Sequence, residues 1–214
     1  MTIHKPGRPE DLPDARTLWA RWAFIAAVRA DSREEQPGRT GYWIDAEGLH
    51  WDDSACTVWT LSPQGEGRFL LYGEEEVSEV RFYEPPIDVL AGGPAWLPFD
   101  ELRERYEDYQ AGTVYWYENG AWARAPYPDD LRDDGLASGL FGVIDRDELL
   151  RELIPHLEEA PGLPDIDSLL TDAEAYRLAP RGWLERLRPG PPYDREPDLP
   201  AVARTLAATG ITTE

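Results

Sequence analysis

An Asn-Gly turn near the middle of the chain constrains its fold more than any other feature. Asn119 and Gly120 separate two runs of aromatic and small residues in the stretch TVYWYENGAWARA, and Asn119 is the only asparagine among the 214 residues. A two-residue type I′ turn needs a positive φ at both central positions, which Asn tolerates and Gly adopts freely. The sequence therefore predicts a tight β-hairpin over residues 113–125.

The turn also sets the register of the hairpin. Counting outward from it pairs residue 118 with 121, 117 with 122, 116 with 123, 115 with 124 and 114 with 125. Because side chains alternate between the two faces of a sheet, one face receives core-like residues and the other an aromatic group with a guanidinium at its edge. The core-like residues are Val114, Trp116, Ala123 and Ala125. The second set, predicted either as another core face or as a binding surface, comprises Tyr115, Tyr117, Trp122 and Arg124.

The charge of the chain restricts its partners. The net charge is -21, of which residues 57–110 contribute -8 and residues 111–160 contribute -7. Such a field repels phosphate backbones and anionic membranes, so direct binding of nucleic acid or membrane is not expected. The remaining interpretations are a basic protein partner, a cation, or acidity that serves solubility alone.

The composition is typical of a folded, soluble protein. Hydrophobic residues make up 42% of the chain, while 20 Pro and 18 Gly predict many loops. The single Cys56 excludes an internal disulfide and favours a reducing compartment. The sequence has no signal-like N-terminal segment and no apolar run of about 18 residues, so we expect a cytoplasmic protein. The oligomeric state is left open.

Periodicity predicts a helix followed by a sheet in the first part of the chain. A helix is expected from Pro9 to about Glu35, ended by Gln36-Pro37-Gly38, with two tryptophans in its apolar stripe. The stripe comprises Ala15, Leu18, Trp19, Trp22, Ile25 and Ala26. The period then changes to two, which predicts antiparallel strands over residues 42–44, 49–51, 57–61, 68–72 and 77–83.

The remaining elements give an α+β class. Asp100 is expected to cap a helix over 100–110 with Leu102, Tyr106 and Tyr109 facing inward, and residues 136–144 are expected to be a strand or extended segment. A capping-box pattern at 145–148 predicts a helix over 146–158. We expect an antiparallel sheet of about five to seven strands in a single domain over 1–160. Residues 161–214 would form a short-helical, proline-rich extension docked on it.

Motif searches support no cofactor and no metal. With Lys5 as the only lysine, a phosphate loop is absent, and Gly65-Glu66-Gly67 lacks the third glycine of a dinucleotide motif. One Cys and three separated His give no zinc spacing. His156 lies near a helix C-terminus, where the helix dipole would stabilise an imidazolium.

Nucleophiles and carboxylates offer weaker alternatives. Ser138 stands one place late for a nucleophile elbow, and Cys56 would need His50 as its base. Acidic clusters suggest a general acid and base, and exposed aromatics could stack on sugar rings. The acids considered are Asp52 and Asp53 beside His50, Glu74 to Glu76, and the loop residues Asp129, Asp130, Asp133 and Asp134, which lack calcium-loop spacing.

These observations lead to one main hypothesis and one alternative. The main hypothesis is a non-enzymatic binding module of the inhibitor or immunity type that presents acids and aromatics to a basic protein, because Tyr, Trp and Arg are enriched at binding hot spots. It assigns no catalytic residues. The alternative is a carboxylate-based hydrolase, or a small-ligand or carbohydrate-binding protein.

Overall fold

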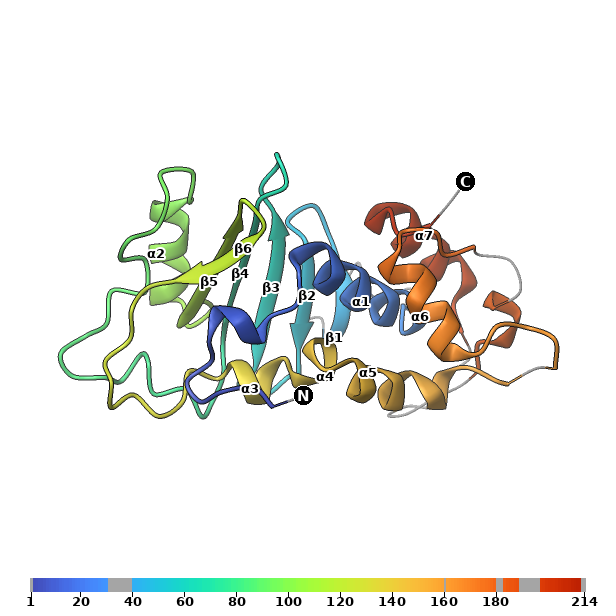
Figure 1. The fold of residues 1–214 in the computed structure, drawn as a ribbon, viewed down its shortest axis with the longest axis horizontal. Helices are drawn as coiled ribbons and strands as arrows, with labels where there is room; N and C mark the ends of the chain where they lie inside the picture. The colour runs from blue at the N-terminus through green and yellow to red at the C-terminus, as the bar shows by residue number, and fades with distance from the viewer. Residues whose placement is uncertain (1, 31–39, 160, 180–182, 189–196, 213–214) are drawn as a thin grey trace.

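The computed structural model of the protein describes residues 2–30, 40–159, 161–179, 183–188 and 197–212. Within these residues six strands pair in chain order into one antiparallel sheet, surrounded by seven α-helices (Figure 1). The strands are β1 (Gly41–Ile44), β2 (Leu49–Asp52), β3 (Val58–Pro63), β4 (Phe69–Glu74), β5 (Thr113–Glu118) and β6 (Ala121–Arg124). The predicted α+β class with an antiparallel sheet is confirmed.

The hairpin that organises the sequence pattern has its predicted register. Asn119 and Gly120 have φ values of 53° and 81°, both positive as a type I′ turn requires. The paired residues of β5 and β6 are Tyr115 and Arg124, Trp116 and Ala123, Tyr117 and Trp122, and Glu118 and Ala121. The strand β5 pairs with β4 on its other side, so the hairpin forms one end of the sheet.

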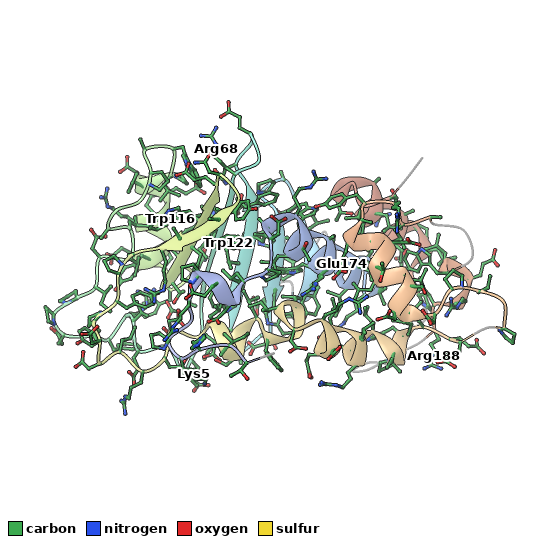
Figure 2. All side chains as sticks on the ribbon, in the orientation of Figure 1. Lys5, Arg68, Trp116, Trp122, Glu174 and Arg188 are labelled. Atoms are coloured by element: carbon green, nitrogen blue, oxygen red, sulfur yellow. The ribbon has the colours of Figure 1, made fainter. Side chains whose placement is uncertain are left out.

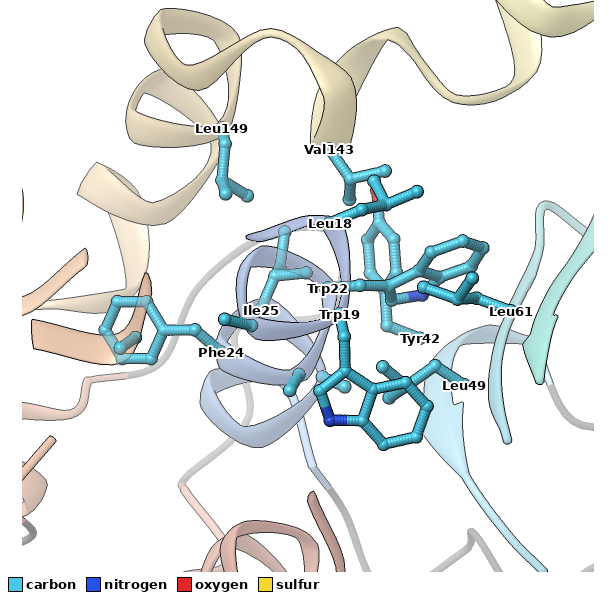
Figure 3. Packing of buried hydrophobic residues seen from close by; sticks show 14 of the residues in the cluster. Leu18, Trp19, Trp22, Phe24, Ile25, Tyr42, Leu49, Leu61, Val143 and Leu149 are labelled. Atoms are coloured by element: carbon cyan, nitrogen blue, oxygen red, sulfur yellow. The ribbon is translucent and has the colours of Figure 1, made fainter. Parts of the chain in front are cut away.

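The helix α1 (Ala15–Val28) is the central element of the larger core. It begins later than predicted, because Pro9–Asp11 forms a separate 3-10 turn and Asp14 then caps α1 by accepting from Arg16 N at 3.0 Å. Eleven of its 14 residues are buried, because the sheet packs on one side of the helix and other helices pack on two further sides. Figure 3 shows Leu18, Trp22 and Ile25 inside this packing. The predicted end at Gln36-Pro37-Gly38 lies outside the described residues.

The other helices on this side follow the hairpin in the chain. They are α3 (Leu136–Gly139), α4 (Phe141–Ile144), α5 (Arg146–Leu153), α6 (Ile166–Glu174) and α7 (Leu199–Thr209), with 3-10 turns at Ile154–His156 and Leu184–Arg186. The cap predicted for the helix after residue 145 is confirmed, since the Asp145 carboxylate accepts from Asp147 N and Glu148 N. The extended segment predicted over 136–144 is wrong. Leu136, Leu140 and Val143 bury one face of two short helices instead.

The helix α2 (Phe99–Glu107) covers the opposite face of the sheet near β4 and β5 (Figure 1). A second, smaller core lies beneath it, comprising Leu70, Tyr72, Val80, Val89, Leu90, Leu97, Leu102, Ala111, Val114, Trp116 and Leu131. The expected cap Asp100 lies in the first turn, after Pro98 at the cap position. The strand predicted over 77–83 is wrong, because local turns use its backbone donors: Phe82 N donates to Glu79 O and Tyr83 N to Val80 O.

The C-terminal helices contact α1 directly. Trp19 Nε1 donates to Thr209 O at 2.9 Å, and Arg21 Nε lies 2.7 Å from a carboxylate oxygen of Glu174, which is labelled in Figure 2. Figure 1 shows α6 and α7 at the end of the molecule opposite to α2. The division into a domain over 1–160 and an extension over 161–214 stays a prediction.

Candidate functional site

The hairpin face predicted as a possible binding surface lies against the chain's own N-terminal segment. Tyr115, Tyr117 and Trp122 are 0%, 7% and 7% exposed. Trp122, labelled in Figure 2, donates through Nε1 to Pro13 O at 2.7 Å, and the Tyr117 hydroxyl donates to the Asp14 carboxylate. Of the two alternatives stated for this face, the structure shows the core. A partner-binding role for these residues stays a prediction and is not the basis of the proposal below.

The fourth residue of that face, Arg124, belongs to a buried polar network. Its Nε donates to Gly7 O at 3.0 Å, and its guanidinium lies 3.8 Å from the ring centroid of Tyr127. The Asp134 carboxylate accepts from Gly7 N and from the Tyr115 hydroxyl, both at 2.8 Å. Burial raises the pKa of the Asp134 carboxyl, against the effect of these hydrogen bonds. The network fixes the N-terminal segment onto the hairpin.

His50 contacts partners other than those considered from the sequence. Its Nε2 lies 2.8 Å from Asp45 Oδ1, its Nδ1 lies 2.9 Å from Thr60 Oγ1, and its ring stacks on Trp43. A neutral imidazole satisfies both contacts by donating to Asp45 and accepting the Thr60 hydroxyl proton. Because Thr60 is 4% exposed and does not line the cavity described below, this arrangement offers no reachable nucleophile.

The acids proposed to act with His50 instead accept hydrogen bonds from backbone groups of their own loop. The Asp52 carboxylate accepts from Ser54 N at 2.6 Å, and the Asp53 carboxylate accepts from Thr57 N at 3.1 Å. Although burial acts to raise it, such backbone hydrogen bonds hold the pKa of the Asp53 carboxyl below its usual value. Cys56 is exposed in the same loop. The structure therefore does not bring these residues together around His50.

The acids of the other two sequence clusters also lie in different surroundings and have different partners. Glu74 pairs with Arg81, Glu75 accepts from Val77 N, and Glu76 is exposed. In the acidic loop, Asp133 pairs with Lys5, Asp134 is buried and Asp130 accepts from Tyr83. Among the described residues, no group of three or more His, Cys, Asp or Glu side chains could hold a metal ion.

Ser138 and His156 have structural surroundings. The Ser138 hydroxyl donates to Gly135 O within α3 at 3.3 Å, so it does not stand at a strand-to-helix elbow. His156 is 8% exposed, and burial together with the charges of Arg29 and Arg188 lowers its pKa to about 4. Although the helix dipole favours an imidazolium, burial next to two arginines disfavours the charged form here.

An exposed aromatic group lies where α2 ends and the chain after β4 passes beside it. Arg81 is 8% exposed and pairs with Glu74 at 2.6 Å. Its guanidinium lies 4.3 Å from the ring centroid of Tyr106 and 4.2 Å from that of Tyr109. Tyr109 is 61% exposed, and Phe82, the residue after Arg81 in the chain, is 73% exposed. We call Arg81, Phe82, Tyr106 and Tyr109 the Arg81 surface.

Acidic residues flank the Arg81 surface along the chain. The exposed ones that adjoin it in sequence are Glu76, Glu84, Glu107 and Asp108. The Arg81 guanidinium is already paired with Glu74, so it fixes the tyrosine rings without making the surface basic. Exposed aromatic residues and exposed acids are therefore close together in the sequence here.

Sequence reasoning missed this surface for identifiable reasons. The helical spacing predicts Tyr109 on the inward stripe, but α2 ends at Glu107 and Tyr109 adopts a φ of 59°, which turns it outward. Phe82 was placed in a strand that does not form. The signal that could have found them is the Pro85-Pro86 pair, which disfavours strand pairing just beyond Phe82.

A cavity of about 440 Å³ lies along α2, beside the turn between β1 and β2. Its lining residues are Ala46, Glu47, Ser62, Pro63, Gln64, Leu70, Tyr72, Pro98, Glu101, Leu102 and Arg105. Three of them have acidic or basic side chains: Glu47, Glu101 and Arg105. The cavity falls within the size range of small-ligand sites.

Arg105 occupies the centre of the polar wall of this cavity. Its Nη2 lies 2.7 Å from Glu47 Oε1 and 3.0 Å from Glu101 Oε1. Glu47 Oε1 also accepts from the Tyr72 hydroxyl, and burial followed by this contact raises the pKa of Tyr72 above its usual value. Glu47 lies in the β1–β2 turn and Arg105 on α2, far apart in the sequence, so no local pattern could predict their pairing.

Comparison of the chain with family models, with curated proteins and with solved structures finds no match. In the described parts of the chain, no helix combines the length and apolar character that crossing a bilayer requires.

Proposed function

We propose that this protein is a non-enzymatic binding module of the inhibitor or immunity type, which recognises a basic protein through the Arg81 surface. The observation that carries the proposal is the exposure of Phe82 and Tyr109, at 73% and 61%, within the most acidic part of the chain. Aromatic anchors in a charged rim are typical of protein-binding hot spots. A cytoplasmic location and the absence of direct nucleic-acid binding belong to the same proposal.

Charge supports the choice of a basic partner. Residues 57–110, which contain the whole Arg81 surface, carry a net charge of -8. A partner of opposite charge would be steered toward this face, and its approach would slow at high salt. The fixed position of Tyr109 against Arg81 lowers the ordering cost of binding, since the ring is already held.

The alternative, a carboxylate-based hydrolase or a small-ligand or carbohydrate-binding protein, would use the cavity beside α2. A glycosidase needs one carboxyl group as acid and another as base or nucleophile. Here Glu47 Oε1 and Glu101 Oε1 both contact Nη2 of Arg105, so neither carboxyl group stands apart as a separate acid or base. This arrangement favours binding over acid–base chemistry.

The proposal is tested by capture from a lysate of the source cell on immobilised protein. We expect a protein of high isoelectric point at low salt, with strong loss at high salt. Phe82→Ser should reduce its recovery at least about tenfold, because a hot-spot aromatic contributes 2 kcal/mol or more. Ile154→Ser is the matched control, since Ile154 is 52% exposed but lies on the 3-10 turn after α5.

Three outcomes would contradict the proposal. They are recovery of no partner, recovery of an acidic partner, or equal loss in Phe82→Ser and Ile154→Ser. Circular dichroism of both variants must match that of the unaltered protein, so that a loss of recovery reports binding and not unfolding.

A further inference from the structure

The cavity beside α2 offers hydrogen-bond acceptors more than donors. The donors of Arg105 are already directed at Glu47, Glu101 and Gln110. Gln64 Nε2 donates to Ser62 Oγ, and Ser62 Oγ donates to Glu47 O. What remains available is the second carboxylate oxygen of Glu47, that of Glu101, and the Gln64 side-chain oxygen, which receive no hydrogen bond from the described residues. A ligand that only donates fits this set.

The net charge and the apolar walls of the cavity further restrict which class of ligand can bind. Two carboxylates and one guanidinium leave the lining with one net negative charge, so an anion is disfavoured and a cation is favoured. Pro63, Leu70 and Leu102 form apolar walls along which a hydrocarbon stem can lie. Carboxylates on two sides suit a planar group with several donors better than a point charge.

We propose that the cavity lined by Glu47, Glu101, Gln64 and Arg105 binds an alkylguanidinium group, supplied as an arginine side chain of the basic protein partner. The stem of the arginine lies against Pro63, Leu70 and Leu102, and its guanidinium donates to the free oxygens of Glu47 and Glu101. The inference deepens the proposed function and rests on it for the source of the arginine. The cavity and the Arg81 surface both use residues of α2, where Arg105 and Tyr106 are adjacent in the chain, so one partner can reach both.

The cavity is tested without the partner by titrating the full chain with n-butylguanidinium at low ionic strength, followed by NMR. We expect saturable shifts confined to amides around the β1–β2 turn and the first turns of α2. The neutral isostere n-butylurea should give no saturable shift, and n-butylammonium should bind more weakly. Equal responses to all three probes would overturn the proposal.

Substitutions assign the binding to the two carboxylates. Glu101→Gln and Glu47→Gln should each weaken n-butylguanidinium at least about tenfold, because each removes a charge-assisted hydrogen bond. Glu104→Gln is the control, since Glu104 is an exposed acid on the same helix outside the cavity. Equal weakening by Glu104→Gln would show a diffuse charge effect and overturn the site. Because Glu101 is more exposed than Glu47, its variant keeps the test valid if Glu47→Gln unfolds.

The experiments distinguish failure of the cavity proposal from failure of the proposed function. If n-butylguanidinium binds in the cavity but no basic protein is captured, the ligand group stands and the proposed function fails. If a basic protein is captured and Glu101→Gln changes neither its recovery nor the binding of n-butylguanidinium, the cavity proposal fails and the function stands. Phe82→Ser should leave n-butylguanidinium binding unchanged, since Phe82 does not line the cavity.

Discussion

Helices α1 and α2 cover opposite faces of one sheet by different means. Eleven of the 14 residues of α1 are buried, whereas Leu102 is the only buried residue of the nine in α2. The helix α1 is enclosed by the sheet, α5, α6 and α7, so its sequence serves packing. The helix α2 buries only Leu102 and has a cavity beside it. The proposed function makes use of this difference, since most side chains of α2 are left at the surface.

The arginines near α2 and the arginine at the end of α1 also have different roles. Arg81 and Arg105 lie over tyrosine rings and pair with carboxylates, which fixes side chains at the surface beside α2. Arg29, at the end of α1, pairs with Glu152 and raises the positive potential around His156. Near α1 the charges therefore stabilise packed helices, while near α2 they shape exposed surface.

Leucine truncation on the two helices is the strongest test of this contrast. Leu18 on α1 and Leu102 on α2 are 0% and 2% exposed. We expect Leu18→Ala to lower the free energy of unfolding by about 4–5 kcal/mol, near the upper end for such changes, because tight neighbours leave a full cavity. Leu102→Ala should cost about 2–3 kcal/mol, because Leu102 already borders a cavity and has fewer contacts to lose. Urea denaturation measures both values. Equal costs would remove the packing difference between the two helices.

Acidification should lower the stability of the helical packing around α1, because it protonates His156. Its pKa is lowered from 6.5 to about 4 in the folded protein, so the neutral form is favoured there. The corresponding stability is present above pH 6.5 and is lost as the pH falls from 6.5 toward 4, with a full size of up to about 3 kcal/mol. Urea denaturation at pH 7 and pH 4.5 should show this loss.

The control for His156 is His156→Gln, which has no imidazole to protonate. Carboxylates elsewhere titrate in both proteins, so only the difference between the two pH dependences reports His156. That difference should be confined to the interval between pH 6.5 and 4. A variant with the pH dependence of the unaltered protein would show that His156 is not held neutral by the fold.

Local chemistry explains what the sequence predicts well. The Asn119-Gly120 turn needs two positive φ values that these residues supply, so the register of the hairpin followed from two residues. The cap at Asp145 depends on hydrogen bonds to residues two and three places on, which are likewise visible in sequence. Both features are settled within a few residues, and both are confirmed.

Tertiary packing decides the elements that were predicted wrongly. Residues 136–144 contain Leu136, Leu140, Val143 and Ile144 at helical spacing, but small residues between them also fit a strand. In the structure this segment packs against Trp59, whose indole lies so close to Gly139 that a Cβ there would be 2.1 Å from Nε1. No local signal specifies that contact, which is made by a residue some 80 positions away.

The candidate surfaces depend on the same kind of distant contact. The hairpin aromatics carried the strongest sequence signal for binding, yet the N-terminal segment covers them through Pro13 and Asp14. The Arg81 surface and the cavity join segments that are distant in sequence, as with Glu47 and Arg105. Residue types could be predicted for a site of this kind, but not which of them meet.

The smallest effect on stability is expected at Tyr109, where it should separate folding from binding. A φ of 59° is left-handed backbone that costs a non-glycine residue about 1 kcal/mol or more, and glycine is the usual residue at this position after a helix. Tyr109→Gly relieves that strain and loses the contact of the ring with Arg81. The two effects are of similar size, so the free energy of unfolding should change by no more than about 1 kcal/mol.

Partner recovery should fall in Tyr109→Gly in spite of this small change, because the exposed ring is the part that meets the partner. Tyr109→Ala is the control: it loses the ring but keeps the strained backbone, so it should bind as weakly as Tyr109→Gly while being about 1 kcal/mol less stable. Urea denaturation and capture on the two variants provide the measurements. If Tyr109→Gly were several kcal/mol less stable than the unaltered protein, the ring would serve to hold the end of α2, and the contrast between a packed α1 and a presenting α2 would fail at its central residue.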